Sequence, residues 1–361
     1  MKIIHTGDIH IGAAMKSLPP DKTDLRKREI MDGFKNLAAF ARDNGVQAVL
    51  IAGDLFDENK VPRQVRNEAF AIISAARPVW FFYVSGNHDD EFEEGESLPE
   101  NLYTFSGNHG WQSYDLPEGV TVTGVDTKNL SPELYDRLAL RQERCNVLLM
   151  HGEAVKSEPR GTESIPLSRL QNKYVDYLAL GHIHKPMRTA ERLDGRGVYR
   201  YCGCPEGRGF DECGERGFFL LELRGGRIVD ERFLSFAKRT VVERTADISA
   251  CENYFDVERA AEQVLADVRA GDMVRLTLIG KYKAGLCKNI SLLTERLNEK
   301  FFFARVEDSS KIYIDYTAYQ NDLSERGEFV REVGRYEMNE ELRAEILDVG
   351  LKALAGEEID L

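Results

Sequence analysis

Short apolar runs alternate with polar turns along the amino-terminal half of the chain. Five runs have the length of buried strands and are rich in Val, Ile, Leu or aromatic residues; they cover residues 2–5, 46–52, 79–84, 146–150 and 175–180. Between the first two runs, apolar side chains recur at nearly helical spacing at Leu25, Ile30, Phe34, Leu37 and Phe40. This spacing predicts a helix within residues 24–44 that stops at Gly45, and a second helix covers 65–76. The alternation indicates a mixed α/β domain.

The pattern changes near residue 236. Residues 199–201, 217–223 and 227–236 are predicted to be the last strands of a first domain, 1–236. A second domain of α+β type is predicted at 240–320, with strands at 241–248, 273–279 and within 302–316 and helices at 257–270 and 290–300.

The last stretch, 321–361, forms a predicted helical tail. Its apolar residues recur at helical spacing and predict two or three short amphipathic helices; they are Phe329, Val333, Tyr336, Leu342, Ile346, Val349, Leu351 and Leu354. The apolar face of this tail either docks on the second domain of the chain or binds a partner.

The charge of the chain is unevenly distributed. Its 48 Lys and Arg residues and 61 Asp and Glu residues give a net charge of −13, which argues against a protein that holds nucleic acid by bulk charge. However, the tail alone holds twelve acidic and five basic residues, and the segment Asp89–Glu96 holds six acidic residues in eight. The net charge therefore does not exclude a local basic groove. Six basic residues near the later polar turns are candidate contacts to phosphate groups: Arg160, Arg169, Lys185, Arg188, Arg200 and Arg208.

Nothing in the sequence indicates a membrane protein. No segment approaches the roughly 18 apolar residues of a membrane span, and residues 1–5 lead into polar sequence instead of the apolar core of a signal peptide. The six cysteines are scattered, which is typical of reduced thiols. We therefore expect a cytoplasmic protein without a membrane partner.

Polar turns that follow the predicted strands carry five of the seven histidines of the chain. In chain order these turns are Gly7-Asp8-Ile9-His10, Gly53-Asp54-Leu55-Phe56-Asp57, Gly86-Asn87-His88-Asp89, His151-Gly152 and Gly181-His182-Ile183-His184. A single turn of this kind is more often ordinary surface, but five in series indicate one shared site.

The residue types in these turns suit two divalent metal ions. Mixed imidazole and oxygen ligands are accepted by Mn²⁺, Fe²⁺ and Zn²⁺, whereas Mg²⁺ and Ca²⁺ favour oxygen alone. A carboxylate between two ions offsets their repulsion, and Asp54 is the natural candidate for this bridge. Two ions at roughly 3.5 to 4 Å lower the pKa of a shared water and hold both oxygens of an in-line displacement at phosphorus.

The five turns resemble the motifs of the calcineurin-like metallophosphoesterases, which read D-x-H, G-D-x-x-D, G-N-H-D/E, H and G-H-x-H in the same order. The resemblance covers residues 8–184. It implies a two-sheet β-sandwich flanked by helices, with the dimetal site on loops at one edge. The periodicity alone allows a doubly wound parallel sheet equally well.

The resemblance also implies a role for each residue. The implied ligands are Asp8, His10 and His184 for one ion and Asn87, His151 and His182 for the other, with Asp54 as the bridge. The two residues assigned to catalysis are His88 and Asp57. His88 would protonate or stabilise the leaving oxygen without binding metal, and Asp57 would orient its loop.

A closer resemblance is to the SbcD nuclease family, and within it to the DNA repair exonucleases of the YhaO type. It is carried by residues 5–12, which match H-T-S-D-x-H-L-G with Gly7 in place of Ser, and by residues 180–186 and 201–206. Residues 272–280 also resemble the central strand of the capping domain of that family. By contrast, Gly53–Asn59 departs from the G-D-x-V-D-R-G of protein phosphatases.

This resemblance implies a manganese-dependent DNA nuclease, with iron, zinc or magnesium as alternative metals. The second domain would guide DNA to the metals, and an SbcC-like coiled-coil ATPase would be the partner of the tail; a homodimer is a further expected assembly. Two other functions stay open: a small-nucleotide phosphodiesterase or phosphatase with a closed pocket, and a regulatory subunit of an ATPase complex. The acidic segment Asp89–Glu96 lies where DNA would approach and counts against long duplex DNA.

Overall fold

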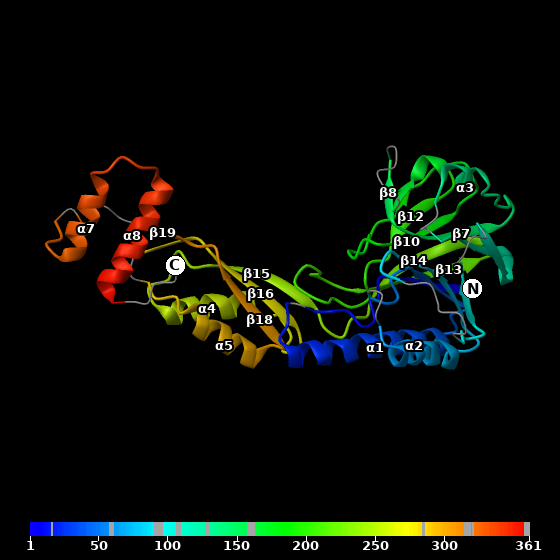
Figure 1. Ribbon diagram of the computed structural model, residues 1–361, viewed down its shortest axis with the longest axis horizontal. Helices are drawn as coiled ribbons and strands as arrows, with labels where there is room; N and C mark the ends of the chain where they lie inside the picture. The colour runs from blue at the N-terminus through cyan, green and yellow to red at the C-terminus, as the bar shows by residue number, and fades with distance from the viewer. Residues whose placement is uncertain are drawn as a thin grey trace. The chain divides into compact units, whose positions relative to one another are not determined.

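The computed structural model describes residues 1–15, 17–57, 61–89, 97–105, 110–126, 130–156, 163–283, 286–313, 319 and 321–356. The chain divides into two units, Met1–Thr240 and Val241–Leu361 (Figure 1). The functional boundaries at residues 236 and 320 stay predictions. Within the described ranges, none of the helices is both long enough and apolar enough to cross a membrane.

The first unit contains two six-stranded sheets. The first sheet has the order β14 (Arg227–Ser235), β13 (Gly217–Arg224), β1 (Lys2–Thr6), β2 (Ala48–Ala52), β3 (Trp80–Val84) and β4 (Leu102–Thr104). The second has the order β11 (Glu191–Arg192), β12 (Val198–Tyr201), β10 (Tyr177–Gly181), β7 (Cys145–His151), β6 (Val120–Gly124) and β5 (Gln112–Leu116). A small parallel pair is formed by β8 (Glu153–Val155) and β9 (Ser164–Pro166).

The two sheets pack face to face around one core. Leu50 and Phe82 of the first sheet and Val147 and Leu149 of the second belong to the same buried cluster. This arrangement confirms the β-sandwich and excludes a single doubly wound sheet. The periodicity could not decide between them because central strands such as β2 are buried on both faces and therefore read as continuous apolar runs.

Two helices flank the first sheet, α1 (Pro20–Asp43) and α2 (Arg63–Ala75), and they lie side by side in Figure 1. The ring of Phe40 in α1 packs on Phe218 of β13, with the ring centroids 5.5 Å apart. Both helices were expected from the spacing of apolar residues. However, α1 begins four residues earlier than the predicted segment, because Pro20 at its first position fixes a helical φ and needs no hydrogen-bond acceptor. The short helix α3 (Pro132–Asp136) packs through Tyr135 on the outer face of the second sheet.

The direction of the strands brings the polar turns together. In the first sheet β1, β2, β3 and β4 are parallel, and in the second β12, β10, β7 and β6 are parallel. Because the carboxyl ends of parallel strands meet at the same edge of a sheet, the turns that follow β1, β2 and β3 are neighbours, as are those that follow β7 and β10.

The second unit is built on a parallel sheet of three strands, β15 (Val241–Asp247), β16 (Met273–Ile279) and β18 (Phe303–Asp308). Helices α4 (Tyr254–Val264) and α5 (Ile290–Lys300) lie together on one side of it in Figure 1, and β17 (Lys281–Lys283) pairs with β19 (Lys311–Tyr313). The bounds predicted for β16 and α5 are confirmed. Helix α4 begins three residues earlier than expected because the side chain of Asn253 accepts a hydrogen bond from Asp256 N at 3.2 Å.

Residues 321–356, the described part of the tail, contain two helices, α7 (Glu325–Gly334) and α8 (Glu340–Ala355). Their buried residues Val330, Val333, Leu347 and Leu351 make one cluster, against which Ile312 of β19 packs. The interpretation in which the tail docks on its own domain is thus confirmed for this face.

Candidate active site

The turns after β1 and β2 are joined by their backbones. Asp8 N donates to Gly53 O at 3.0 Å, and His10 N donates to Asp54 O at 2.9 Å. Asp8, His10 and Asp54 all have φ near +49°, in the left-handed region that residues other than glycine rarely adopt. Strain of this kind persists only where the surroundings enforce it, and it is concentrated at functional sites.

Two glycines allow the turns to approach closely. A Cβ atom on Gly86, after β3, would overlap the side chain of Asp54, and one on Gly181, at the end of β10, would overlap Ala52 O. The first contact joins two turns of the first sheet, and the second joins the first sheet to the second.

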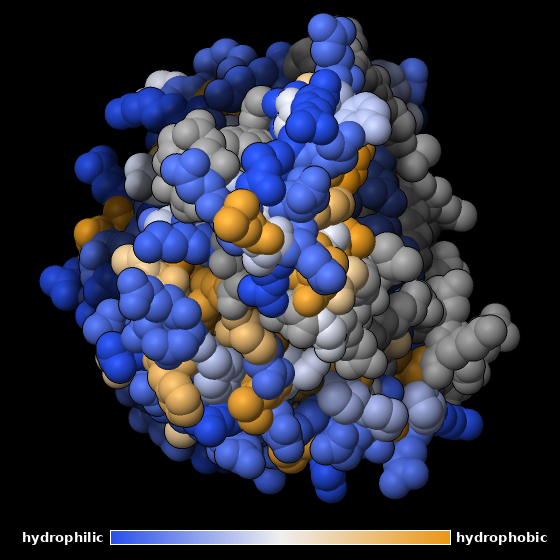
Figure 2. Space-filling model, turned by 90° about the vertical axis from the view of Figure 1, so that its left-hand side faces the viewer, coloured by the Kyte–Doolittle hydropathy of each residue, from blue (hydrophilic) through white to orange (hydrophobic). Residues whose placement is uncertain are grey.

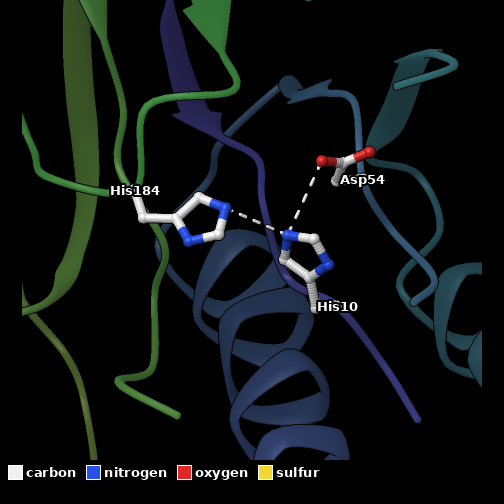
Figure 3. A group of neighbouring side chains, drawn as sticks. All are labelled: His10, Asp54 and His184. Atoms are coloured by element: carbon white, nitrogen blue, oxygen red, sulfur yellow. Dashed lines mark hydrogen bonds and ion pairs between the residues drawn. The ribbon is translucent and has the colours of Figure 1, made fainter. Parts of the chain in front are cut away.

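One group of facing ligand atoms consists of His10, Asp54 and His184 (Figure 3). The Nε2 atoms of His10 and His184 lie 3.1 Å apart, and His10 Nε2 lies 3.6 Å from Asp54 Oδ2. The other nitrogen of each ring is occupied: His10 Nδ1 donates to Asp57 Oδ1 at 2.8 Å, and His184 Nδ1 donates to Glu212 Oε1 at 2.7 Å. In the neutral rings, both Nε2 atoms therefore present lone pairs to each other, an arrangement that a cation between them would satisfy.

A second group consists of Asp8, Asp54 and His151. Asp54 Oδ2 lies 3.5 Å from His151 Nε2, so the same oxygen faces both groups. His151 Nδ1 lies 2.9 Å from Ala52 O and donates to it, which leaves Nε2 as the ligand atom. Asn87 Oδ1 lies 2.9 Å from His151 Nε2 and 3.3 Å from His182 Nδ1.

The residues present fit two divalent ions. Asp8 is fully buried, and its Oδ2 atom has no hydrogen-bond partner among the described residues. Burial raises the pKa of this carboxyl group, and a nearby cation would favour its charged form. Imidazole nitrogen, carboxylate and amide oxygen together match the preferences of Mn²⁺, Fe²⁺ and Zn²⁺. The structure thus brings together all seven side chains that were expected to bind metal.

Two residues assigned to catalysis lie beside these groups. Burial alone would raise the pKa of Asp57, but the hydrogen bond from His10 favours the carboxylate and the pKa is lowered. His88 is half-buried; its Nδ1 lies 4.0 Å from Asp57 Oδ1, its ring centroid lies 5.0 Å from that of His10, and its backbone N donates to Asp54 Oδ1 at 3.0 Å. His88, Asp57 and His10 thus form a third group of facing ligand atoms, in which part of the His88 ring is open to solvent.

The sequence motifs missed Glu212. It is buried, it holds the ring of His184, and it accepts hydrogen bonds from Arg208 Nη2 at 2.7 Å and Nε at 3.0 Å. Despite its burial, the hydrogen bonds from His184 and Arg208 hold the pKa of Glu212 well below its usual range. Burial lowers the pKa of His184, but the bond to Glu212 outweighs this and raises it. The sequence singled out Arg208 as a candidate phosphate contact, but for its pairing with Glu212 it offered only the i, i+4 spacing.

The prediction that Asp89 adds negative charge where DNA would approach is wrong. Its side chain is buried and accepts hydrogen bonds from Phe56 N and Gly86 N, each at 2.9 Å. Burial raises the pKa of Asp89, and the negative charge of the neighbouring Asp54 raises this pKa further. Asp89 thus joins the turns after β2 and β3, because a short acidic side chain can satisfy several backbone amides at once. The other acidic residues of this segment, 90–96, lie outside the described residues.

The candidate phosphate contacts have different surroundings. Arg188 pairs with Glu215 at 2.5 Å and stacks over the ring of Phe233 at 3.5 Å. Lys185 is exposed, and Arg160 lies outside the described residues. Arg208, another of the candidate contacts, lies at the site, where its Nη1 is 3.4 Å from Asp57 Oδ1.

The arrangement of these turns agrees with a match to a known family model. The model described as Calcineurin-like phosphoesterase matches residues 1–186, which is more than half of the 361 residues. The chain belongs to this family. The match begins before β1 and ends after His184, so it includes every facing ligand atom described above.

Curated relatives are similar to this phosphoesterase over most of its length. A DNA double-strand break repair protein Mre11 of Methanopyrus kandleri is 27% identical over 305 residues, which cover 76% of this chain and 64% of that protein. An uncharacterized metallophosphoesterase YhaO of Bacillus subtilis is 25% identical, with 78% and 72% covered. The SbcD component of the SbcCD nuclease of Escherichia coli is 24% identical, with 63% and 66% covered. The chain spans less than two thirds of the Methanopyrus protein.

Proposed function

We propose that this chain is a metal-dependent phosphodiesterase that cleaves DNA in repair. The observation that carries the proposal is the pair of lone-pair-bearing Nε2 atoms of His10 and His184, 3.1 Å apart, beside Asp54. The name of the Methanopyrus relative, a DNA double-strand break repair protein, supports DNA as the substrate, and the name of the Escherichia relative supports nuclease activity. The cytoplasmic location and a homodimer stay predictions.

The proposed ion ligands are those expected from the motifs. Asp8, His10 and His184 would hold one ion, Asn87, His151 and His182 the other, and Asp54 both. When bound, the ions, which we propose to be manganese, supply Lewis acidity and positive charge for an in-line displacement at phosphorus. The chain itself contributes the fixed direction of its ligands: Asp57 and Glu212 hold the rings of His10 and His184.

His88 supplies the proton chemistry in this proposal. Its half-buried ring lies beside that of His10, and the hydrogen bond from the backbone N of His88 to Asp54 holds the turn that carries the ring. From this position it would donate a proton to the leaving oxygen or stabilise the charge that develops there.

We expect the purified chain to cleave linear single-stranded or double-stranded DNA with Mn²⁺ and to lose this activity in a chelator. The comparison substrates are bis-p-nitrophenyl phosphate and mononucleotides, measured at the same metal concentration. A nuclease cleaves DNA and the small diester but spares mononucleotides. Turnover of nucleotides without any cleavage of DNA would instead establish the small-nucleotide alternative.

The tail is the proposed binding surface for a coiled-coil ATPase of the SbcC type. Leu342, Val349 and Leu354 of α8 are 46%, 39% and 42% exposed although they are apolar. The end of the molecule that carries α7 and α8 shows apolar side chains among hydrophilic ones (Figure 2). The Escherichia relative is named as one subunit of the SbcCD nuclease, and this name supports a second subunit here.

We expect the double substitution Leu342→Asp and Val349→Asp to abolish co-purification with the ATPase encoded in the same organism. Hydrolysis of bis-p-nitrophenyl phosphate is expected to stay unchanged, because neither residue belongs to the buried cluster of the tail. The matched control is Leu323→Asp, which adds the same charge at a residue 96% exposed outside α8. Retained association of the double variant would refute this surface.

A further inference from the structure

The two proposed ion positions have different surroundings. At the position between His10 and His184, each ring donates its Nδ1 proton to a carboxylate, Asp57 at 2.8 Å and Glu212 at 2.7 Å. At the other position, His151 donates its Nδ1 proton to a neutral backbone oxygen, Ala52 O, at 2.9 Å, while its Nε2 and His182 Nδ1 both face Asn87 Oδ1 on the ligand side. A carboxylate behind an imidazole makes the ring a more basic ligand than a neutral carbonyl does.

Arg208 joins the two carboxylates into one frame. Its Nη1 lies 3.4 Å from Asp57 Oδ1, and its Nη2 lies 2.7 Å from Glu212 Oε1. The backbone N of Arg208 also donates to Glu212 Oε2 at 2.6 Å, so both carboxylate oxygens of Glu212 are bound. Since the side chain of Glu212 is only 3% exposed, water cannot replace these contacts.

The segment that carries Glu212 also holds the backbone of its histidine. Arg216 donates through Nη1 to His184 O and through Nε to Glu212 O, the latter at 3.2 Å. His184 is therefore fixed at its ring and at its carbonyl by residues 208–216, which lie outside the five motifs. This double attachment is what a side chain needs in order to present its Nε2 atom in one direction.

We propose that Glu212 is a positioning residue for His184, and that the ion position between His10 and His184 binds metal more tightly than the position between His151 and His182. The proposal rests on the proposed two-ion site and adds an order of loading to it. The second position would then exchange its ion at metal concentrations at which the first stays filled.

The test is isothermal titration calorimetry, in which the metal-free full chain is titrated with Mn²⁺ alone. We expect two binding steps in the wild type. Glu212→Gln keeps the size and the acceptor oxygen but removes the charge, and it should weaken the tight step by roughly 10- to 100-fold while the weak step stays unchanged. His182→Ala should remove the weak step and leave the tight one.

The matched control is Glu215→Gln, the same substitution three residues away on an exposed side chain, for which both steps should equal those of the wild type. If Glu212 had a purely structural role, Glu212→Gln would weaken both binding steps together, and this result would overturn the proposal. Two equal steps in the wild type, or an unchanged tight step in Glu212→Gln, would also overturn it. Should Glu212→Gln melt early without metal, Glu212→Asp is the second variant: it keeps the charge but shortens the side chain by one methylene, and it should weaken the tight step alone, whereas weakening of both steps overturns the proposal. Wild-type protein that binds no Mn²⁺ would refute the metal site itself.

Discussion

Asp54→Ala is expected to lose both metal ions and all hydrolysis of bis-p-nitrophenyl phosphate, whereas His88→Ala should keep the ions and lose activity by roughly 10²- to 10⁴-fold. The difference follows from their contacts. Asp54 Oδ2 faces His10 Nε2 at 3.6 Å and His151 Nε2 at 3.5 Å, so its removal takes the shared negative charge from between two cations. The ring of His88 faces Asp57 and His10 in a third group of facing atoms, which does not include Asp54, so its removal leaves the shared carboxylate in place.

Metal content after dialysis against Mn²⁺, measured by mass spectrometry, separates these outcomes from each other. Asp54→Asn is the matched variant, because it keeps the shape of the side chain and the hydrogen bond from His88 N while it removes the charge. It should also lose metal. If His88→Ala loses metal, then His88 is a ligand and its assignment to proton transfer is wrong.

The motif residues could be predicted because each follows a strand. The runs that became β1, β2, β3, β7 and β10 are apolar enough to be recognised, and parallel pairing then brings their carboxyl ends to one edge. Chain order and residue type were therefore sufficient to predict that Asp8, Asp54 and His151 lie together. What periodicity could not supply was the division into two sheets, because strands buried on both faces carry no alternation.

Residues that act through others escaped the sequence. Glu212 lies 28 residues after the histidine that it holds, in a segment without a recognisable element pattern. Asp89 was grouped with its acidic neighbours by composition, but three backbone amides in two turns determine its place. Contacts of this kind depend on tertiary structure, so no local pattern of charge or hydrophobicity predicts them.

Arg26 in α1 illustrates the same limit and has the largest expected effect on stability. Its side chain is fully buried; Nη1 donates to Glu29 Oε2 at 2.7 Å, and Nη2 donates to Glu206 Oε2 at 3.0 Å and to Gly207 O at 2.7 Å. It thereby ties α1 to the segment that leads directly to Arg208. Helical spacing places this arginine on the buried face of α1, where charge is unexpected.

Arg26→Met should lower the free energy of unfolding by about 3 to 5 kcal/mol, measured by urea denaturation of the metal-free chain. The substitution keeps most of the volume but leaves Glu206 buried without its cation, and burial already raises the pKa of that carboxyl group. Arg28→Met is the matched control on the exposed face of the same helix, where we expect a change within about 0.5 kcal/mol. Equal stability of the two variants would mean that the buried cluster contributes nothing.

The pH dependence of the same cluster provides an independent check through Glu29. Burial opposes the shift, but Arg239 and Arg26 lower the pKa of Glu29 from 4.5 to about 2 in the folded chain. Because the folded state binds the proton less readily than the unfolded state, the stabilisation is complete above pH 4.5 and is lost as the pH falls towards 2. The stability difference between wild type and Glu29→Gln should therefore shrink across this interval, and a difference that is constant with pH would show that Glu29 titrates alike in both states.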